Sequence, residues 1–527
     1  MGAPGHVVEQ QDEVVAFLTD PRTHGGAEVT RIDTHGAVVV LAGDRAYKLK
    51  RAVRFPYMDF STLALRRRAA EAELILNRRT APALYLAVEP VTRTPSGALA
   101  IGGGGPAVDW LVVMRRFDQD ALFDRLATRG ALDARLMSEL ADEILRFHAG
   151  AEPRPDYGGA AGIARVVVGN DQGLAEAGPA AFPRDKVAAL GRESQAVLAS
   201  RAALLEARRA QGLVRHCHGD LHLGNICLFE GRPTLFDSIE FNEEIACVDV
   251  LYDLAFLLMD LDHRELDDLA NLVLNRYLSE GARQGALGDL TGLAALPLFL
   301  ACRAGVRAQV SAAAAAAQPE PHAARRLVGA ASSYLDLALR YLAPPPPRLV
   351  AIGGLSGTGK STLARALAPQ LGASPGALML RSDVIRKHLA GRDSLSRLGP
   401  ESYTPEASAR VFETIRARAA TALAAGHAVI ADAVYGRAEE RAAIESVARD
   451  LGVRFDGLWL EAPAPVLEGR VVARSADASD ATREVVRRQL ASPLGEIGWA
   501  RLDAAGAPRI MARRARELLG LGPGRAP

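Results

Sequence analysis

The sequence carries no excess charge of either sign and no long apolar run. Its 63 Lys and Arg residues stand against 62 Asp and Glu residues, which gives a formal net charge of +1. No global field therefore attracts nucleic acid or an anionic membrane surface. The longest apolar stretch, residues 290–302, is far shorter than the roughly 20 residues that span a bilayer. The N-terminus also lacks a basic start followed by an apolar segment, so we expect a soluble protein without membrane contact or export signal.

Cysteine and lysine are both scarce. The four cysteines show no C-x-x-C spacing, which favours a reducing cytoplasm over an oxidising compartment. Only five lysines occur, and three of them are Lys48, Lys50 and Lys360. Arginine, with its wide planar fork, cannot replace a compact ammonium packed against phosphates. Lysine is therefore expected where a phosphate contact requires it. The alternative is that so few lysines occupy these positions by chance.

The chain is too long for one ordinary core, because 527 residues correspond to roughly three compact units. The clearest boundary is the proline run at 344–347, which forms a stiff extended spacer. We therefore expect a first domain over 1–343, a linker over 344–347 and a second domain over 348–527. Within the first domain, a small lobe is expected at about 25–117 and a helical lobe at about 118–343.

Short apolar runs between turn signals predict an antiparallel sheet near the N-terminus. The expected strands of the small lobe are 28–33, 37–41, 45–49, 84–91 and 110–114, with a helix over 63–79. The residues that follow show mainly helical periodicity up to the proline run. After that run, strands and helices alternate, which predicts a parallel sheet covered on both faces.

The segment His-Gly-Asp-Leu-His-Leu-Gly-Asn, residues 218–225, is followed by a further aspartate. Phosphoryl transfer needs a group that accepts the proton of the attacking hydroxyl, together with oxygen ligands for magnesium. We predict that Asp220 is the catalytic base and that Asn225 and Asp237 are the metal ligands. Two alternatives are a polar turn between buried helices and a metal site made by His216, His218, His222 and Cys217.

These residues resemble the aminoglycoside phosphotransferase and choline kinase-like family over about 25–340. The resemblance implies an α+β, two-lobed, protein-kinase-like fold in which Lys48 contacts the phosphates and Glu73 is its ion-pair partner. Lys50 lies on the same strand face, so the two lysines could exchange roles. No G-x-G-x-x-G loop precedes them, and Asp237 is followed by Ser-Ile-Glu instead of Phe-Gly. Glu240 is therefore a candidate for the metal or substrate side.

The second domain opens with Gly-Leu-Ser-Gly-Thr-Gly-Lys-Ser, residues 354–361, after the apolar run 349–352. This matches the P-loop pattern G-x-x-x-x-G-K-[ST] between a strand and a helix, where backbone N–H groups cradle phosphates. In such a loop Lys360 reaches the outer phosphates and Ser361 ligates magnesium. The predicted nucleotide contacts are Gly354, Ser356, Gly357, Thr358, Gly359, Lys360, Ser361 and Thr362. A fortuitous glycine turn is the alternative.

Further polar residues follow the later strands of the second domain. Asp432 ends an apolar run and is a candidate magnesium ligand, or else a substrate contact. Arg470 and Arg474 are four residues apart on one expected helix and could close as a lid over the nucleotide. An exposed helix face is the alternative for these two arginines.

Over about 348–500 the chain resembles the gluconate kinase, zeta-toxin and polynucleotide kinase group of P-loop kinases. The resemblance implies an α/β P-loop fold with a parallel sheet, in which Asp383 is the base and Arg386 anchors the substrate. A helix N-cap is the alternative for Asp383. The pairing of the two domains itself resembles a bacterial arrangement of phosphotransferase plus ATP-binding protein.

Together these patterns predict a bifunctional kinase that uses ATP and Mg²⁺ and phosphorylates alcohol groups of small molecules. A sugar, a polyol, an aminoglycoside-like compound or a nucleoside would each qualify as acceptor. A second interpretation makes one domain a nucleotide-responsive regulatory module. A third makes the C-terminal domain a nucleic-acid end kinase, although aromatic stacking residues are sparse there. The acceptor and the oligomeric state remain open at this point.

Overall fold

The computed structural model describes residues 6–394, 396–473 and 478–522. The chain forms two compact units that do not follow chain order. The first comprises the residues up to Arg264 together with Phe299–Leu339. The second comprises Glu265–Leu298 and the residues from Arg340 onward. Residues 265–298 thus lie with the C-terminal unit, although they precede the proline run by about fifty residues along the chain.

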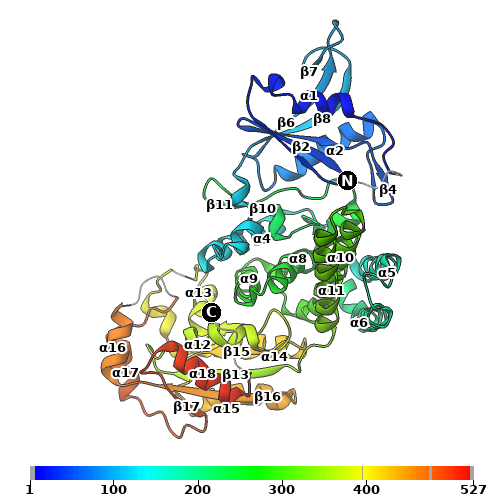
Figure 1. Ribbon diagram of the computed structural model, residues 1–527. Helices are drawn as coiled ribbons and strands as arrows, with labels where there is room; N and C mark the ends of the chain where they lie inside the picture. Colours follow the sequence, from blue (N-terminus) through cyan, green and yellow to red (C-terminus); the bar gives the residue numbers. More distant parts are fainter. Residues whose placement is uncertain (1–5, 395, 474–477, 523–527) are drawn as a thin grey trace. The chain divides into compact units, whose positions relative to one another are not determined.

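The small lobe of the first unit is a six-stranded antiparallel sheet with strand order β1-β2-β3-β8-β6-β7 (Figure 1). Its strands are β1 Val29–Asp33, β2 Ala37–Ala42, β3 Arg45–Lys50, β6 Tyr85–Arg93, β7 Leu99–Ile101 and β8 Ala107–Arg115. Every strand expected from the sequence is present within a few residues. The short strand β7 and the hairpin of β4 (Arg54–Phe55) and β5 (Met58–Asp59) had not been expected.

One helix packs on each face of this sheet. Helix α1 (Asp12–Thr19) contributes Val14 and Leu18 to a core with Val40 and Leu49. Helix α2 (Leu63–Asn77) contributes Ala70 to a core on the opposite face, where it meets Ala46 and other residues. Since side chains alternate along a strand, Lys48 and Lys50 project from β3 toward the same side as Ala46. Both lysines therefore lie on the face of β3 that packs against α2.

The rest of the first unit is mainly helical, as expected. Its helices are α3 Phe123–Thr128, α4 Ala134–Gly150, α5 Gly159–Ala177, α6 Arg184–Ala210, α7 Glu243–Ala246, α8 Val250–His263, α10 Leu296–Ala317 and α11 Pro321–Leu342. Two small sheets interrupt them, formed by β9 (Val214–His216) with β12 (Cys247–Asp249) and by β10 (Ile226–Phe229) with β11 (Arg232–Leu235). The β9–β10 connection and the segment after β11 carry the predicted catalytic residues.

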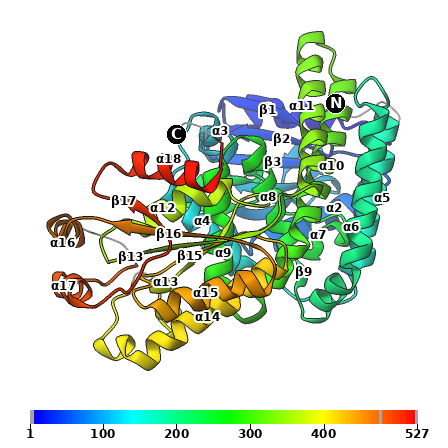
Figure 2. The same cartoon turned by 90° about the horizontal axis from the view of Figure 1, so that it is seen from below.

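The second unit contains a five-stranded parallel sheet with strand order β14-β15-β13-β16-β17. Its strands are β13 Arg348–Gly354, β14 Leu378–Arg381, β15 Val429–Asp432, β16 Arg454–Glu461 and β17 Ala500–Asp503. Helices α12 (Lys360–Leu367) and α18 (Pro508–Leu519) cover one face, while α14 (Pro405–Ala424) and α15 (Ala438–Asp450) cover the other (Figure 2). Further helices of this unit are α13 Ser382–Leu389, α16 Ala464–Ala473 and α17 Arg483–Ala491. The predicted fold classes, two-lobed kinase-like α+β and parallel α/β, are both confirmed.

Helix α9 (Asp267–Gly281) supplies the side chains that join segment 265–298 to the parallel sheet. The amide of Asn271 donates to the Ala377 carbonyl at 3.1 Å. Asn275 donates to the same carbonyl at 3.1 Å and accepts the Met379 N–H at 2.6 Å. These bonds satisfy backbone groups on the outer edge of β14, which pairs with no strand among the described residues. Within the described ranges, no helix combines the length and apolarity needed to cross a bilayer.

Candidate active sites

The loop of the first unit that carries the predicted catalytic residues, here called the catalytic loop (residues 217–225), is held in place by carboxylates of α8. Asp253, which is fully buried, accepts the backbone N–H of Gly219 at 2.9 Å and that of His218 at 3.2 Å. About two turns further along the helix, Asp260 accepts the Leu223 N–H at 3.0 Å. Buried carboxylates that accept several N–H groups fix a loop firmly, because moving the loop would leave a buried charge unpaired.

Asp220, Asn225 and Asp237 line one cavity of about 450 Å³, as the sequence predicts. Asn225 donates to a carboxylate oxygen of Asp220 at 2.8 Å. Burial alone would raise the pKa of Asp220, but the neighbouring His222, at 3.3 Å, outweighs it and lowers that pKa well below its usual value. Asp220 is therefore ionised at neutral pH and can accept a hydrogen bond from a hydroxyl.

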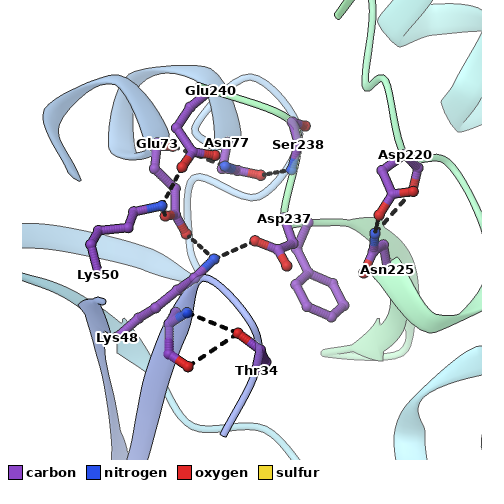
Figure 3. A network of polar contacts seen from close by, with 12 residues as sticks. Thr34, Lys48, Lys50, Glu73, Asn77, Asp220, Asn225, Asp237, Ser238 and Glu240 are labelled. Carbon is purple, nitrogen blue, oxygen red and sulfur yellow. Dashed lines mark hydrogen bonds and ion pairs between the residues drawn. The ribbon is translucent and has the colours of Figure 1, made fainter. Parts of the chain in front are cut away.

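Lys48 joins the small lobe to the predicted metal ligand (Figure 3). Its ammonium lies 2.9 Å from one oxygen of Glu73 on α2 and forms a second, short contact with Asp237. Burial by itself lowers the pKa of Lys48, but Asp237 and Glu73 outweigh this effect and raise the pKa well above its ordinary value. Burial likewise disfavours the charged form of Asp237, yet Lys48 holds its pKa below the usual range. Both groups are charged in this site.

Lys50 pairs with the second oxygen of Glu73 and with Glu240, so that it lies deeper than Lys48. The side chain of Lys50 is 3% exposed, whereas that of Lys48 is 12% exposed. Lys48, at the open end beside Asp237, is thus the better candidate for phosphate contact. Glu240 lines the same cavity but is only 4% exposed and paired with Lys50. Its role toward substrate stays a prediction.

The alternative metal site at His216, His218, His222 and Cys217 does not form in the described part of the chain. His218 instead contacts the Phe236 carbonyl through Nε2 at 2.9 Å, and His222 accepts the Gly224 N–H. Potential ligand atoms converge in one other place among the described residues, at His148, Cys217 and Asp253. There the Asp253 carboxylate already accepts the N–H groups of the catalytic loop.

The P-loop of the second unit has the backbone shape that a phosphate cradle needs. Gly357 and Gly359 have φ angles of +89° and +90°, a region that favours glycine. A Cβ on Gly357 would lie 2.8 Å from the Leu467 carbonyl oxygen. Helix α12 begins at Lys360, whose ammonium donates to the carbonyls of Gly354 and Leu355 at 2.9 and 3.2 Å. The N-terminus of α12 and Lys360 both line one cavity.

The predicted base and metal ligands of the second unit share a cavity of about 460 Å³ with the P-loop. Ser361 donates to Asp432 at 2.5 Å, as expected for a pair that would hold one metal ion. Asp383 lines the cavity where β14 passes into α13. Burial, reinforced by the charge of Asp432, raises the pKa of Asp383 above its usual value. A carboxylate with a raised pKa is a stronger base than an ordinary aspartate.

The predicted arginines are placed differently from one another. Arg386 donates to the Ser402 carbonyl at 2.6 Å and lies over the Tyr403 ring at 4.9 Å, outside the residues that line the cavity. Arg470 does line the cavity, but it donates to the Ala504 carbonyl at 2.7 Å and so braces the loop after β17. Their roles as substrate anchor and lid stay predictions. Arg474 lies outside the described residues.

Two basic residues near this cavity were missed. Arg381, the last residue of β14, lines the cavity, and its Nε lies 3.6 Å from Asp432. Lys387 is 1% exposed and lies 3.5 Å from Asp480, which also accepts the Tyr403 hydroxyl at 2.9 Å. The scarcity of lysine could have drawn attention to Lys387, which is one of only five.

Two family matches agree with this geometry. Residues 107–288 match the family described as "Phosphotransferase enzyme family", and residues 349–493 match the family described as "AAA domain". The uncharacterized proteins Rv2004c of Mycobacterium tuberculosis and Mb2027c of Mycobacterium bovis are each 30% identical over 481 residues. These alignments cover 90% of this chain and 92% of each relative. The chain belongs to their family. This chain joins a phosphotransferase-type kinase domain to a P-loop kinase domain, as the two resemblances in the sequence implied.

Solved structures with similar folds fall into two groups. A choline/ethanolamine kinase family protein from Mesorhizobium loti is 14% identical, with a TM-score of 0.37, over 63% of this chain and 97% of its own. A sugar kinase from Janibacter sp. HTCC2649 is 22% identical, with a TM-score of 0.26, over 34% of this chain and 97% of its own.

Proposed function

We propose that this protein is a bifunctional phosphotransferase that uses ATP and Mg²⁺ to phosphorylate hydroxyl groups of small molecules at two separate sites. One observation carries the proposal: each unit holds a candidate base in the same cavity as its own phosphate lysine. Asp220 shares its cavity with Lys48, and Asp383 shares its cavity with Lys360. Neither unit therefore depends on the other for a catalytic group.

The residues of the first site fit a magnesium–nucleotide complex. Magnesium prefers oxygen ligands, and Asp237 and Asn225 supply a carboxylate and an amide oxygen beside the open cavity. Bound magnesium would neutralise oxygens of the triphosphate. Lys48 carries the positive charge that a β- or γ-phosphate oxygen needs. The apolar part of the cavity, which includes Val39 and Met114, suits a nucleobase.

In this first site the ionised Asp220 is the group that would orient the acceptor. It would accept a hydrogen bond from the attacking hydroxyl and take its proton as the acceptor oxygen bonds to the γ-phosphorus of ATP, while the bond from that phosphorus to the oxygen of the leaving ADP breaks. Because its pKa is low, Asp220 is a weak base, and the proton passes to it late in the reaction. Orientation by Asp220, held through Asn225, is then its larger contribution.

The second site fits the same cofactors by a different construction. Backbone N–H groups of the P-loop and Lys360 would bind the phosphates, while Ser361 and Asp432 would hold magnesium. Asp383 has a raised pKa and is therefore better suited to accept the hydroxyl proton early. The two sites would thus bind the same magnesium–nucleotide complex and activate a hydroxyl on two different folds.

The four cysteines support a cytoplasmic location, which also belongs to this proposal. Cys217, Cys227, Cys247 and Cys302 are all free and buried. Burial raises the pKa of each of the four thiols, so that they are protonated and unreactive. A reducing compartment, where ATP and magnesium are abundant, is consistent with unpaired cysteines.

The test is a screen of small hydroxyl compounds and short oligonucleotides for an ATP-dependent gain of one phosphate group. The wild type is compared with Asp220→Asn and Asp383→Asn, and with Asp336→Asn and Asp450→Asn as exposed controls in the two units. We expect each active-site variant to lose one phosphorylated product at least a hundredfold while the other persists, and the controls to keep both. A wild type that only hydrolyses ATP, or one product lost in both variants, would contradict two independent sites. Phosphorylated oligonucleotides would instead support an end kinase.

A further inference from the structure

Lys50 and Glu240 form the closed end of a chain of alternating charges in the first unit. The order along this chain is Asp237, Lys48, Glu73, Lys50 and Glu240, with an ion pair at every step (Figure 3). The Asp237 side chain is 42% exposed and that of Lys48 12%, whereas the side chains of Glu73, Lys50 and Glu240 are at most 4% exposed. The open end faces the nucleotide cavity, whereas the closed end has almost no access to solvent.

Both ends of this charge chain belong to one short piece of backbone. Asp237 and Glu240 are three residues apart, and their partners Lys48 and Lys50 are two residues apart on one face of β3. Glu73 joins the two halves, because each of its carboxylate oxygens takes one lysine. The segment 237–240 is therefore attached to β3 at two points. The two lysines that make these attachments are also paired with Glu73 of α2.

Neutral contacts fix the same segment between the two ion pairs. The Ser238 N–H donates to Asn77 of α2 at 2.9 Å, and Asn77 in turn donates to the Glu73 carbonyl at 2.9 Å. The Ile239 N–H donates to the His218 carbonyl in the catalytic loop at 2.9 Å. Asp237 itself has a φ of +64°, an uncommon conformation for a residue with a side chain. Such a conformation persists only where its surroundings hold it.

We propose that Lys50 and Glu240 are positioning residues of the first site: as a buried ion pair they hold segment 237–240 against β3 and α2, so that Asp237 stays oriented toward a metal–nucleotide complex. The inference rests on the proposed function of this site. It differs from the single lysine–glutamate pair that the sequence predicted, because the second pair acts on the metal ligand and not on the phosphates. Neither Lys50 nor Glu240 needs to touch the nucleotide.

The balance of charge gives the second pair a further consequence. Three carboxylates and two ammonium groups make up this charge chain. Without Lys50, the single positive charge of Lys48 would have to balance the negative charges of Glu73, Asp237 and Glu240. Lys50 neutralises Glu240 and shares Glu73, which leaves the Lys48 charge directed to the open end. Removal of Glu240 alone would leave Lys50 paired only with Glu73 and would release one end of the segment.

The test measures nucleotide binding at the first site in the full-length chain. All proteins carry Lys360→Met to suppress the P-loop site, and a further Lys48→Met variant identifies the remaining binding as that of the first site. The probe is a non-hydrolysable ATP analogue, titrated with and without Mn²⁺. We expect Glu240→Gln to weaken the Mn²⁺-dependent binding by about 10- to 100-fold, the range typical of residues that orient metal ligands. Binding of the metal-free analogue should change less than twofold, because Lys48 remains.

Two further variants keep the test decisive. Glu243→Gln is the matched control, since Glu243 lies three residues further on in an exposed pair with Arg154. The double variant Lys50→Met/Glu240→Gln replaces a buried ion pair by neutral groups, which is often harmless to stability. It should melt close to the reference and still bind Mn²⁺–nucleotide weakly. Lys50→Met alone should melt lower, because it leaves Glu240 buried without a partner.

The outcomes separate this inference from the proposed function. If the reference protein binds no nucleotide at the first site, the proposed function of that site is wrong and the positioning role falls with it. If the reference binds but Glu240→Gln and the double variant match it within twofold, the positioning role alone is refuted. An equal loss of metal-free and metal-bound affinity in the double variant would also refute it, because a general loss of structure would then be the cause.

Discussion

The buried His427 should make the stability of the C-terminal unit depend on pH. The residue is 1% exposed in front of β15, and its Nε2 lies 2.8 Å from the Gly376 carbonyl oxygen. Burial lowers the pKa of His427 from its ordinary 6.5 to about 4, although the contact with Gly376 acts in the opposite direction. The folded unit therefore holds this imidazole neutral at a pH where the unfolded chain binds a proton.

The sign and size of the effect follow from these two pKa values. The stabilisation that comes from keeping His427 neutral is fully present above pH 6.5. It is lost progressively as the pH falls toward 4, because only the unfolded chain takes up the proton in that window. At pH 5 the free energy of unfolding should be lower by ~2 kcal/mol than at pH 7, and below pH 4 the loss levels off at ~3 kcal/mol. A domain of ordinary stability has a total of about 5–15 kcal/mol.

Tryptophan fluorescence can follow the C-terminal unit by itself. Trp459 and Trp499 belong to this unit and are nearly buried, so Trp110→Phe removes the signal of the first unit. Urea unfolding at pH 7 and pH 5 is compared between this background and the same protein carrying His427→Gln, whose amide can still donate to Gly376. Other groups titrate equally in the two proteins. The decrease in the free energy of unfolding between pH 7 and pH 5 should therefore be smaller by ~2 kcal/mol in the His427→Gln variant. An identical loss in both proteins would refute the reasoning.

Two further predictions concern the C-terminal unit. Gly357→Ala forces a side chain into a left-handed conformation and 2.8 Å from a backbone oxygen of α16. Calorimetry in a Lys48→Met background should show nucleotide affinity about 5- to 30-fold lower, since such a conformation costs roughly 1–2 kcal/mol. Gly391→Ala, equally left-handed but in open space, should bind normally. Asn275→Ala should destabilise this unit by ~1–3 kcal/mol in urea, because two hydrogen bonds to the β14 edge are lost. The exposed Asp268→Ala on the same helix should change stability by less than about 0.5 kcal/mol, and equal effects of the two would contradict the role of Asn275.

Local patterns were enough to predict most of the sheet strands and the position of each catalytic segment. The strands expected around Lys48 and before the P-loop are present, because their apolar alternation or continuous apolar runs decide burial within a few residues. Strand β17 and the β4–β5 hairpin were not predicted from the sequence, because such segments are short and lack an apolar run. Three of the four residues of Ala500–Asp503, for example, are exposed. Their existence depends on a neighbouring strand that is already in place.

The sequence by itself determined which polar groups each candidate site contains, because a P-loop and a His-Gly-Asp segment each place their polar groups within a few residues of one another. Only the tertiary structure decided how residues distant in the chain share those groups. It gave Lys48 the open position and Lys50 the buried one, since both lie on the same strand face and only their packing against Glu73 and Glu240 distinguishes them. It also assigned α9 to the edge of β14, because an unpaired strand edge accepts any suitably placed donor and acceptor, whatever their distance along the chain.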